Sequence, residues 1–485
     1  MKIHEPIGGQ LEILSRSDIE KIHGATVEVL ERLGMKVWEP RAFDLFKDAG
    51  AETDSKTKMV RISESLLKET VGRAPSEFYM YGRDPKYRLR MGAKRVHFSL
   101  AGQTVKVHDL TGLVRDTVMK DTEDVAKIGD HCEYIHHISL GTTPKDVPDE
   151  VHGAHHIWAN WRNSVKTTDG YNYGAKLSER TLEMLSILRG GEEEMMKTPT
   201  LLGFTNPVSP MQLSTELMQG AMIYAKHNQP MLYAPEALAG GTAPVTLAGL
   251  LVQQNAEVLS GIMVSQLVRP GAPVFYGTVS AAMDMRTGSP ALGGPEVGLI
   301  NVAAAQLARH YDLPCRGTGG NTDSKVNDMQ AGYESSTTLM MAALAGMNFI
   351  YDAAGSLEGS LTMSLEKIVM DNELCGMISR TLSGIEVSEE TMAVGEILRA
   401  GPSASHLGAP FTMRKFRSEL FIPSLLDRRA RDSWTKDGKK DMQARAREEA
   451  KLILKEHQPE PIDPSIVADM EKFLKRVDKE AGRSV

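Results

Sequence analysis

Residues 245–277 read VTLAGLLVQQNAEVLSGIMVSQLVRPGAPVFYG, and this stretch decides the fold class. Its first part, Val245–Val268, is long and apolar, and it predicts a helix. Arg269-Pro270-Gly271 then predicts a tight turn, and the apolar run Pro273–Gly277 predicts a short β-strand. A helix that is followed by a turn and an apolar strand is the repeating unit of parallel α/β proteins.

The same unit recurs along the chain. Helical patterns over Leu213–His227 and Gly332–Leu344 each lead into another apolar run. The strand-like runs are Val96–Ser99, Ile135–Leu140, Val165–Thr168, Thr200–Phe204, Met231–Ala234, Pro273–Gly277, Pro314–Gly317 and Met347–Tyr351. Eight strands with helices between them predict an α/β fold of the (β/α)8 TIM-barrel type. A doubly wound open sheet is the alternative, but it needs a Gly-rich phosphate loop after the first strand, and the sequence has none there.

The barrel pattern divides the chain into three parts. Residues 94–385 carry the strand-like runs and form the predicted barrel. Residues 1–93 are polar and helical without strand alternation, which predicts an N-terminal helical extension. Ser17 and Glu20 have the spacing of a capping box at the start of its first helix. Residues 386–485 become highly charged and predict a C-terminal helical extension.

Composition excludes several classes of protein. The 485 residues carry 56 basic and 63 acidic side chains, and a formal charge of −7 gives no reason to expect nucleic acid as a partner. The sequence contains no apolar run of 18 residues, so no membrane span is predicted. Met1–Pro6 lacks the apolar core of a signal peptide. The three cysteines, Cys132, Cys315 and Cys375, argue against a disulfide scaffold and for a reducing compartment. We therefore expect a cytoplasmic globular protein.

Aromatic residues gather at the predicted strand ends, where TIM barrels place their chemistry. Only 6% of the residues are aromatic, yet Phe98, Phe204, Tyr276 and Tyr351 each fall in or at the end of a strand-like run. Aromatic faces attract cations, so rings that converge at the barrel mouth would form a cage for a quaternary ammonium group, at ~0.5–2 kcal/mol per ring. The alternative for each ring is ordinary packing in the core.

Polar residues follow the last two predicted strands. Arg316 lies in the seventh strand-like run, where a guanidinium must be paired, and a substrate carboxylate is a natural bidentate partner. The alternative partner is an internal acid such as Asp352 or Glu236. Asn321 and Asp352 are further candidates, as groups that position the substrate.

The sequence holds no complete motif for a metal, a nucleotide or a nucleophile. His152 and His155 share a helical face but lack the further ligands of a metal site. Cys315 could act as a nucleophile or zinc thiolate, or it could be a plain core residue. No Walker A sequence and no GxSxG elbow occurs. A barrel mouth without these groups suggests that a cofactor carried by another protein supplies the difficult chemistry.

Four parts of the sequence resemble the trimethylamine methyltransferase family. They are Asn206-Pro207-Val208-Ser209-Pro210, Gly241–Gly249, Thr322–Glu334 and Ile350–Glu373. The similarity runs over essentially the whole chain. Founding members carry pyrrolysine near the seventh strand loop, whereas this sequence has only the twenty standard residues. It is therefore similar to the non-pyrrolysine branch of the family.

The resemblance implies a TIM-barrel methyltransferase that demethylates a quaternary amine, such as glycine betaine, proline betaine or carnitine. The methyl group would pass to the Co(I) corrinoid of a separate corrinoid protein, with no metal or cofactor permanently bound, and we expect a homo-oligomer. The residues expected to bind the substrate are Phe98, Phe204, Tyr276, Arg316, Asn321, Tyr351 and Asp352. There are two alternatives. One is a zinc-dependent methyl transfer that uses Cys315 and nearby histidines, and the other is a non-catalytic methylamine-binding barrel.

Overall fold

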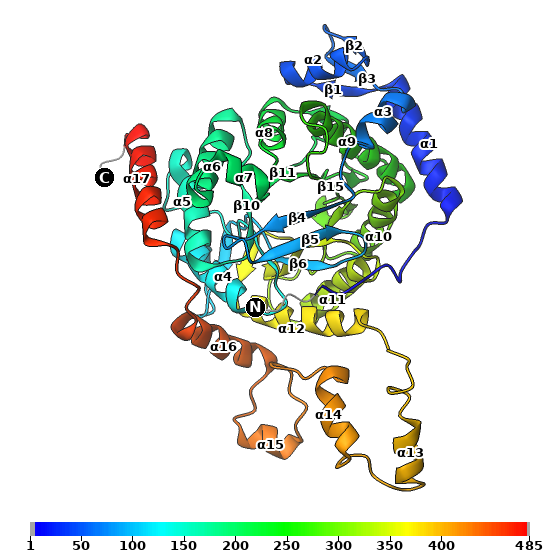
Figure 1. The fold of residues 1–485 in the computed structure, drawn as a ribbon, viewed down its shortest axis with the longest axis vertical. Coiled ribbons are helices and arrows are strands. Elements are labelled where there is room, and N and C mark those ends of the chain that lie inside the picture. The colour runs from blue at the N-terminus through cyan, green and yellow to red at the C-terminus, as the bar shows by residue number, and fades with distance from the viewer. Residues whose placement is uncertain (1–4, 483–485) are drawn as a thin grey trace.

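The computed structural model describes residues 5–482 and contains a closed barrel of parallel strands (Figure 1). The strands hydrogen-bond in the order β10-β11-β13-β15-β18-β19-β6-β9, which closes the ring. Each overlaps one of the predicted runs: β6 (His97–Leu100), β9 (His137–Ile138), β10 (Thr167–Gly170), β11 (Leu201–Thr205), β13 (Met231–Tyr233), β15 (Val274–Gly277), β18 (Cys315–Thr318) and β19 (Phe349–Ala354). The predicted TIM barrel is therefore confirmed. Most of the segment considered as a signal peptide, residues 1–4, lies outside the described residues.

Helices surround the barrel on its outer side (Figure 1). They are α4 (Met119–His131), α5 (Asp149–Asn163), α6 (Ala175–Arg189), α7 (Glu192–Lys197), α8 (Thr215–Lys226), α9 (Leu247–Val268), α10 (Pro295–His310), α11 (Met329–Leu344) and α12 (Leu365–Leu382). The three helices predicted between residues 213 and 344 are confirmed as α8, α9 and α11.

The helix α9 is apolar on all its sides because other elements cover all its sides. By length and composition it could cross a membrane, with a mean hydropathy of 1.2 over 18 residues, but 72% of that window is buried inside the protein. Its inner side packs on β15, and α8 and α10 flank it. Its outer side is covered by α1 (Arg16–Arg32) and α3 (Glu64–Val71) of the N-terminal extension. An all-round apolar helix is the expected sequence for such a position.

The N-terminal extension is not purely helical, and this part of the prediction is wrong. Besides α1, α2 (Pro40–Asp48) and α3 it contains the short strands β1 (Met35–Val37), β2 (Glu52–Asp54), β3 (Met59–Arg61), β4 (Glu77–Tyr81) and β5 (Arg88–Gly92). One of them, β1, pairs with β12 (Gln212–Leu213) far along the chain, so no local pattern marks it. The first helix is also capped differently, by Ser15 with Asp18 instead of Ser17 with Glu20.

The β4–β5 hairpin closes the N-terminal end of the barrel. Met80 and Leu89 of the hairpin pack with the inward-facing Phe275 in one apolar cluster. The Tyr81 N–H donates to the Pro199 carbonyl, which lies just ahead of β11, at 2.8 Å. This apolar plug leaves the other end of the barrel, where the strands finish, as the open mouth.

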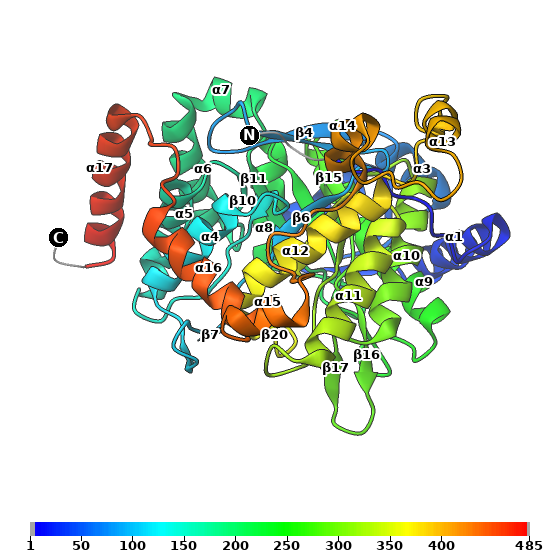
Figure 2. The ribbon, with the colours of Figure 1, turned by 90° about the horizontal axis from the view of Figure 1, so that it is seen from below.

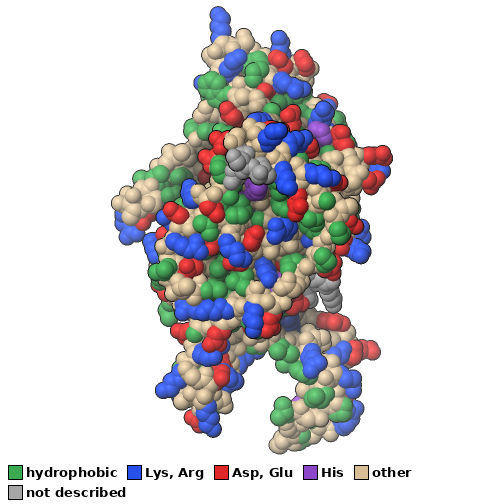
Figure 3. Space-filling model, turned by 90° about the vertical axis from the view of Figure 1, so that its left-hand side faces the viewer, with side chains coloured by type: hydrophobic (Ala, Val, Ile, Leu, Met, Phe, Trp, Pro, Cys, Tyr) green, Lys and Arg blue, Asp and Glu red, His purple; other side chains and the backbone are tan. Residues whose placement is uncertain are grey.

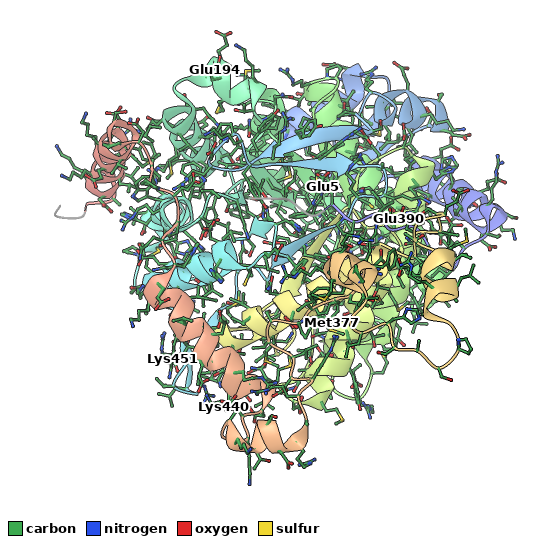
Figure 4. The ribbon with its side chains drawn as sticks, turned by 60° about the horizontal axis from the view of Figure 1, so that its bottom comes forward. Glu5, Glu194, Met377, Glu390, Lys440 and Lys451 are labelled. Carbon is green, nitrogen blue, oxygen red and sulfur yellow. The ribbon has the colours of Figure 1, made fainter. Side chains whose placement is uncertain are left out.

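The C-terminal extension lies on the outside of the helix layer. Its helix α16 (Met442–Glu456) packs on α12 and α4, and α17 (Pro464–Glu480) packs on α5 and α6. Between α12 and α16, the short helices α13 (Val394–Ala400), α14 (Pro410–Glu419) and α15 (Arg431–Lys436) bury none of their residues. Figure 4 shows Glu390 and Lys440 at this periphery. The boundaries after residues 93 and 385 stay a prediction.

The surface carries both signs of charge. Figure 3 shows acidic and basic side chains intermingled over one face of the molecule. This mixture agrees with the small net charge of −7.

Candidate active site

A cavity of about 740 Å³ lies at the mouth of the barrel, lined by residues at the ends of β10, β11, β18 and β19 and in the loops that follow the strands. These loops contain the hairpin strands β16 (Ala281–Asp284), β17 (Ser289–Ala291), β20 (Ser356–Leu357) and β21 (Thr362–Ser364). Figure 2 shows β16, β17 and β20 at the opposite end of the barrel from β4. Active sites of TIM-barrel enzymes lie at this end. Among the residues predicted to bind substrate, the cavity is lined by Phe204, Arg316, Asn321, Tyr351 and Asp352.

Arg316 is the buried cation of this cavity, with 1% of its surface exposed. Its Nη1 donates to the Thr278 carbonyl at 2.9 Å, and its Nε has no hydrogen-bond partner. The guanidinium carbon lies 5.0 Å from the centre of the Phe204 ring and 4.6 Å from that of Tyr351. Burial lowers the pKa of Arg316, and nearby acids, Asp352 first, counteract this. Among the described residues, no acid forms an ion pair with Arg316 within 4.0 Å, so the predicted alternative of an internal salt bridge is not what the structure contains.

Asp352 reaches the cavity through a bulge in β19. The register between β19 and β6 shifts between Ile350 and Ala354, and Asp352 has a left-handed φ of 60°. The side chain is 6% exposed. Burial raises the pKa of Asp352 to about 6, although the Arg316 guanidinium opposes the shift. The carboxyl therefore changes its charge close to neutral pH.

Asn321 follows β18 and has 1% of its surface exposed. Neither its Nδ2 nor its Oδ1 makes a hydrogen bond of ordinary length and angle, although the amide lies near enough to Asp352 to favour the charged carboxylate. A buried amide without partners costs free energy, about 1–3 kcal/mol in proteins. Such a group, in a cavity that also holds an arginine Nε without a partner, is suited to bind a polar part of a ligand.

A hydrogen-bonded group of three residues lies beside these side chains. The Tyr351 hydroxyl donates to Oδ2 of Asp169 at 2.5 Å, and Nε2 of His137 lies 3.0 Å from Oδ1 of the same carboxylate. Asp169 also accepts the Leu140 N–H at 3.2 Å and is buried. Asp169 and His137 were not among the site residues predicted from the sequence. An acid at the end of a barrel strand was the available signal for Asp169.

Two further side chains form the outer part of the cavity. Phe204 is half-buried, and its ring lies 6.2 Å from that of Tyr351. Glu236 is exposed at the end of β13, and its Oε1 accepts the Asn206 amide at 2.8 Å. The cavity thus combines one buried cation with several carboxyl groups and an aromatic wall.

Phe98 and Tyr276 do not line the cavity. Phe98 belongs to the core between strands and helices, where its ring stacks on His136 at 6.0 Å. Tyr276 follows the inward-facing Phe275 and points outward, and its hydroxyl donates to Oδ1 of Asn255 at 3.0 Å. The expectation that these two rings face the mouth is therefore wrong, since neighbouring residues of a strand point to opposite faces.

The residues considered for zinc lie in separate places. Cys315 is buried, its Sγ lies 3.4 Å from Oδ1 of Asn348, and burial raises the pKa of its thiol to about 11. His155 pairs with Asp478 at 3.0 Å, and Nδ1 of His152 contacts a tyrosine hydroxyl. Within residues 5–482, no group of three or more His, Cys, Asp or Glu side chains is arranged to hold a metal ion.

Comparisons with known proteins agree with the sequence resemblance. The family model described as trimethylamine methyltransferase (MTTB) matches residues 2–482. Glycine betaine methyltransferase of Desulfitobacterium hafniense (strain Y51) is 35% identical over 472 residues, which cover 97% of this chain and 98% of the relative. Trimethylamine methyltransferase of Methanosarcina thermophila is 37% identical, covering 96% and 97%. The crystal structure of the Methanosarcina barkeri monomethylamine methyltransferase aligns with a TM-score of 0.49 and 11% identity, over 98% of this chain and 96% of that one.

Proposed function

The chain belongs to the trimethylamine methyltransferase family, and from this premise we propose that it demethylates a quaternary amine that bears a carboxylate, such as glycine betaine. The members of this family are methyltransferases, so the chain is a methyltransferase. The proposal concerns the methyl donor and the acceptor, which would be the Co(I) corrinoid of a separate corrinoid protein. A relative that covers nearly the whole chain and is named glycine betaine methyltransferase supports this choice of donor.

The observation that carries the proposal is the buried Arg316 with its unpartnered Nε. A guanidinium that is removed from water, and that forms no ion pair within 4.0 Å among the described residues, lacks hydrogen bonds that a carboxylate can supply in pairs. Asn321, whose amide lies near Asp352 in the same cavity, would add a donor. Trimethylamine has no carboxylate and would leave these groups unsatisfied. The cavity is therefore better suited to a betaine.

The positive end of a betaine would lie toward Asp352 and Glu236, which line the same cavity. The guanidinium of Arg316 already lies over the faces of Phe204 and Tyr351. We therefore propose that these rings support the arginine and line the cavity beside the substrate. Carboxylates hold a quaternary ammonium by charge alone, because it has no N–H to donate. Phe204, Arg316, Asn321, Tyr351 and Asp352 are thus our proposed substrate-binding residues.

In the proposed reaction these residues only bind and orient the substrate. A Co(I) corrinoid bound to the partner protein would supply the nucleophile for the methyl group, and the electron pair of the broken C–N bond would stay on the tertiary amine. The side chains named above would hold the methyl group toward the mouth and exclude water from it. No proton has to move in this reaction, so it needs no general acid or base.

The rim of the cavity is suited to receive a second protein. Leu113, Met285 and Leu361 lie at or beside hairpin turns in the loops after β6, β15 and β19, and all three are more than half exposed. Several exposed apolar side chains around one opening are typical of a surface that a partner covers. The free thiols of the described chain also agree with the reducing, cytoplasmic setting that we expect.

An anaerobic assay with a candidate corrinoid protein in its Co(I) state tests the function. A panel of methylamines and betaines is offered, and the loss of the Co(I) absorbance is followed. We expect methyl transfer from a betaine and not from trimethylamine. Arg316→Met should weaken the apparent affinity for the betaine by about 10- to 100-fold, the worth of a charged hydrogen bond. The exposed arginine variant Arg476→Met is the matched control, with no expected change.

The two alternatives make different predictions in the same experiment. A non-catalytic barrel would bind a betaine, yet the Co(I) absorbance would persist with every donor and every candidate corrinoid protein. A zinc enzyme would lose activity with a chelator and recover it with zinc. Transfer from trimethylamine in preference to every betaine would contradict our choice of substrate.

A further inference from the structure

Arg316 is held in place mainly by contacts with aromatic rings. The guanidinium makes one hydrogen bond, from Nη1 to the Thr278 carbonyl at 2.9 Å. The guanidinium carbon also lies over the rings of Phe204 and Tyr351, at 5.0 and 4.6 Å from their centres. Whatever fixes these rings therefore also fixes the guanidinium.

Tyr351 is fixed in turn by Asp169. Its hydroxyl donates to Oδ2 at 2.5 Å, and Asp169 is held by the Leu140 N–H and by Nε2 of His137. Nδ1 of that histidine lies 2.9 Å from the Thr167 hydroxyl, which itself donates to the His136 carbonyl at 3.3 Å. The carboxylate thus contacts three polar neighbours, Tyr351, Leu140 and His137, which hold it beside the tyrosine.

We propose that Asp169 is a positioning residue that acts through Tyr351 on Arg316, and so sets the affinity of the cavity for the carboxylate end of its substrate. A phenol that donates to a carboxylate has more electron density in its ring, and an electron-rich face attracts a guanidinium more strongly. The chain of contacts runs from the carboxylate through the ring to the cation. The inference rests on the proposed function, because it assumes a substrate that carries a carboxylate.

The position of Arg316 over the Tyr351 ring distinguishes a support for the arginine from a cage for the substrate ammonium. Arg316 lies over the Tyr351 ring, so that face is not open to the ammonium of a substrate. A cage residue would select for the positive end of the ligand, whereas a support for Arg316 selects for the negative end. The two roles can be told apart with ligands that carry only one of the charges.

The experiment measures Kd by calorimetry for three ligands. Glycine betaine carries both charges, 3,3-dimethylbutanoate replaces the trimethylammonium group by an uncharged group of the same shape, and tetramethylammonium lacks the carboxylate. The proteins are the wild type, Asp169→Asn, Tyr351→Phe and the double variant. We expect both single variants to weaken the two carboxylate ligands by about threefold to tenfold and to leave tetramethylammonium unchanged. The double variant should match Tyr351→Phe, because the effect of Asp169 passes through the hydroxyl.

Several outcomes would overturn the inference. A loss confined to the two ammonium ligands would mean that the rings hold the positive end. An equal loss for all three ligands would indicate general damage to the site, and additive losses in the double variant would show that Asp169 does not act through Tyr351. If Asp169→Asn does not fold, Tyr351→Phe alone decides by the same ligand pattern. A wild type that binds neither carboxylate ligand would overturn the proposed function and this inference with it, whereas the other outcomes leave the function standing.

Discussion

Tyr351 and Asp352 are neighbours in the chain, and both side chains line the same cavity. In a regular strand they would point to opposite faces of the barrel wall. The bulge in β19 changes this, because Asp352 adopts a φ of 60° and the pairing with β6 shifts around it. Bulges next to active sites commonly redirect a side chain in this way. Here the bulge adds a carboxyl group to a wall that already holds Tyr351.

Gly320 makes room for the bulge, and its replacement should destabilise the protein. Its φ is 85°, and a Cβ at this position would lie 2.7 Å from the Asp352 carbonyl oxygen. Gly320→Ala combines a strained φ with this clash, so we expect the free energy of unfolding to fall by about 1–3 kcal/mol, as measured by urea unfolding. The matched control is Gly332→Ala in α11, where a Cβ meets nothing within 4 Å. Equal stability of the two variants would contradict the prediction.

The affinity for a betaine should depend on pH through Asp352. Burial raises the pKa of this carboxyl to about 6, so it is charged above that pH and neutral below it. Only the charged form attracts the ammonium group, and we therefore expect Kd for glycine betaine to increase as the pH falls through 6. In Asp352→Asn this step should be absent. Calorimetric titrations between pH 5 and pH 8 would reveal it, and an unchanged pH profile in the variant would refute the assignment.

The same carboxyl should lower stability at neutral pH. Its pKa in the folded protein lies above the ordinary value of 3.8, so the folded state binds the proton more tightly than the unfolded state. The folded protein therefore loses stability as the pH rises through the interval between these two values. Asp352→Asn should remove this loss, and its advantage over the wild type should vanish at the acid end. Thermal unfolding of both proteins across the interval checks the sign.

The buried pair Lys367–Asp371 should stabilise the loop after β18. The Lys367 Nζ lies 2.9 and 2.7 Å from the two carboxylate oxygens and donates to Ser335 Oγ at 3.0 Å. Lys367→Met leaves a buried carboxylate without its cation, which should cost about 3–5 kcal/mol of the free energy of unfolding. The double variant Lys367→Met/Asp371→Asn should cost clearly less. Urea unfolding of both compares them, and an equal cost would argue against a direct pairing.

Tyr276 should matter for stability and not for binding. Tyr276→Phe removes the hydrogen bond to Asn255 in the helix layer, and we expect a loss of about 1 kcal/mol in the free energy of unfolding with no change in Kd for glycine betaine. Tyr351→Phe removes a hydroxyl within the cavity and should weaken binding. Calorimetry and urea unfolding on both variants test the contrast. Weaker betaine binding by the Tyr276 variant would restore the cage that the sequence analysis proposed.

Much of the site was accessible from the sequence because it lies at strand ends. Arg316, Asn321 and Phe204 were predicted from their place in or after strand-like runs, and all three line the cavity. Phe98 and Tyr276 were predicted on the same ground and point the other way. The difference between these residues is one of strand register, and a shift by one residue exchanges the two faces of a strand.

The sequence by itself determined the architecture. Helix, turn and apolar strand recur along the chain, and this local periodicity is enough to specify a closed parallel barrel with its chemistry at the strand ends. The tertiary structure alone decided which side chains meet there. Asp169 and Tyr351 come from β10 and β19, 182 positions apart, and the hydrogen bond between them depends on the closure of the barrel. The bulge at Asp352 likewise depends on the pairing of β19 with β6. Contacts of this kind are set by packing between distant segments, so no local pattern in the chain can encode them.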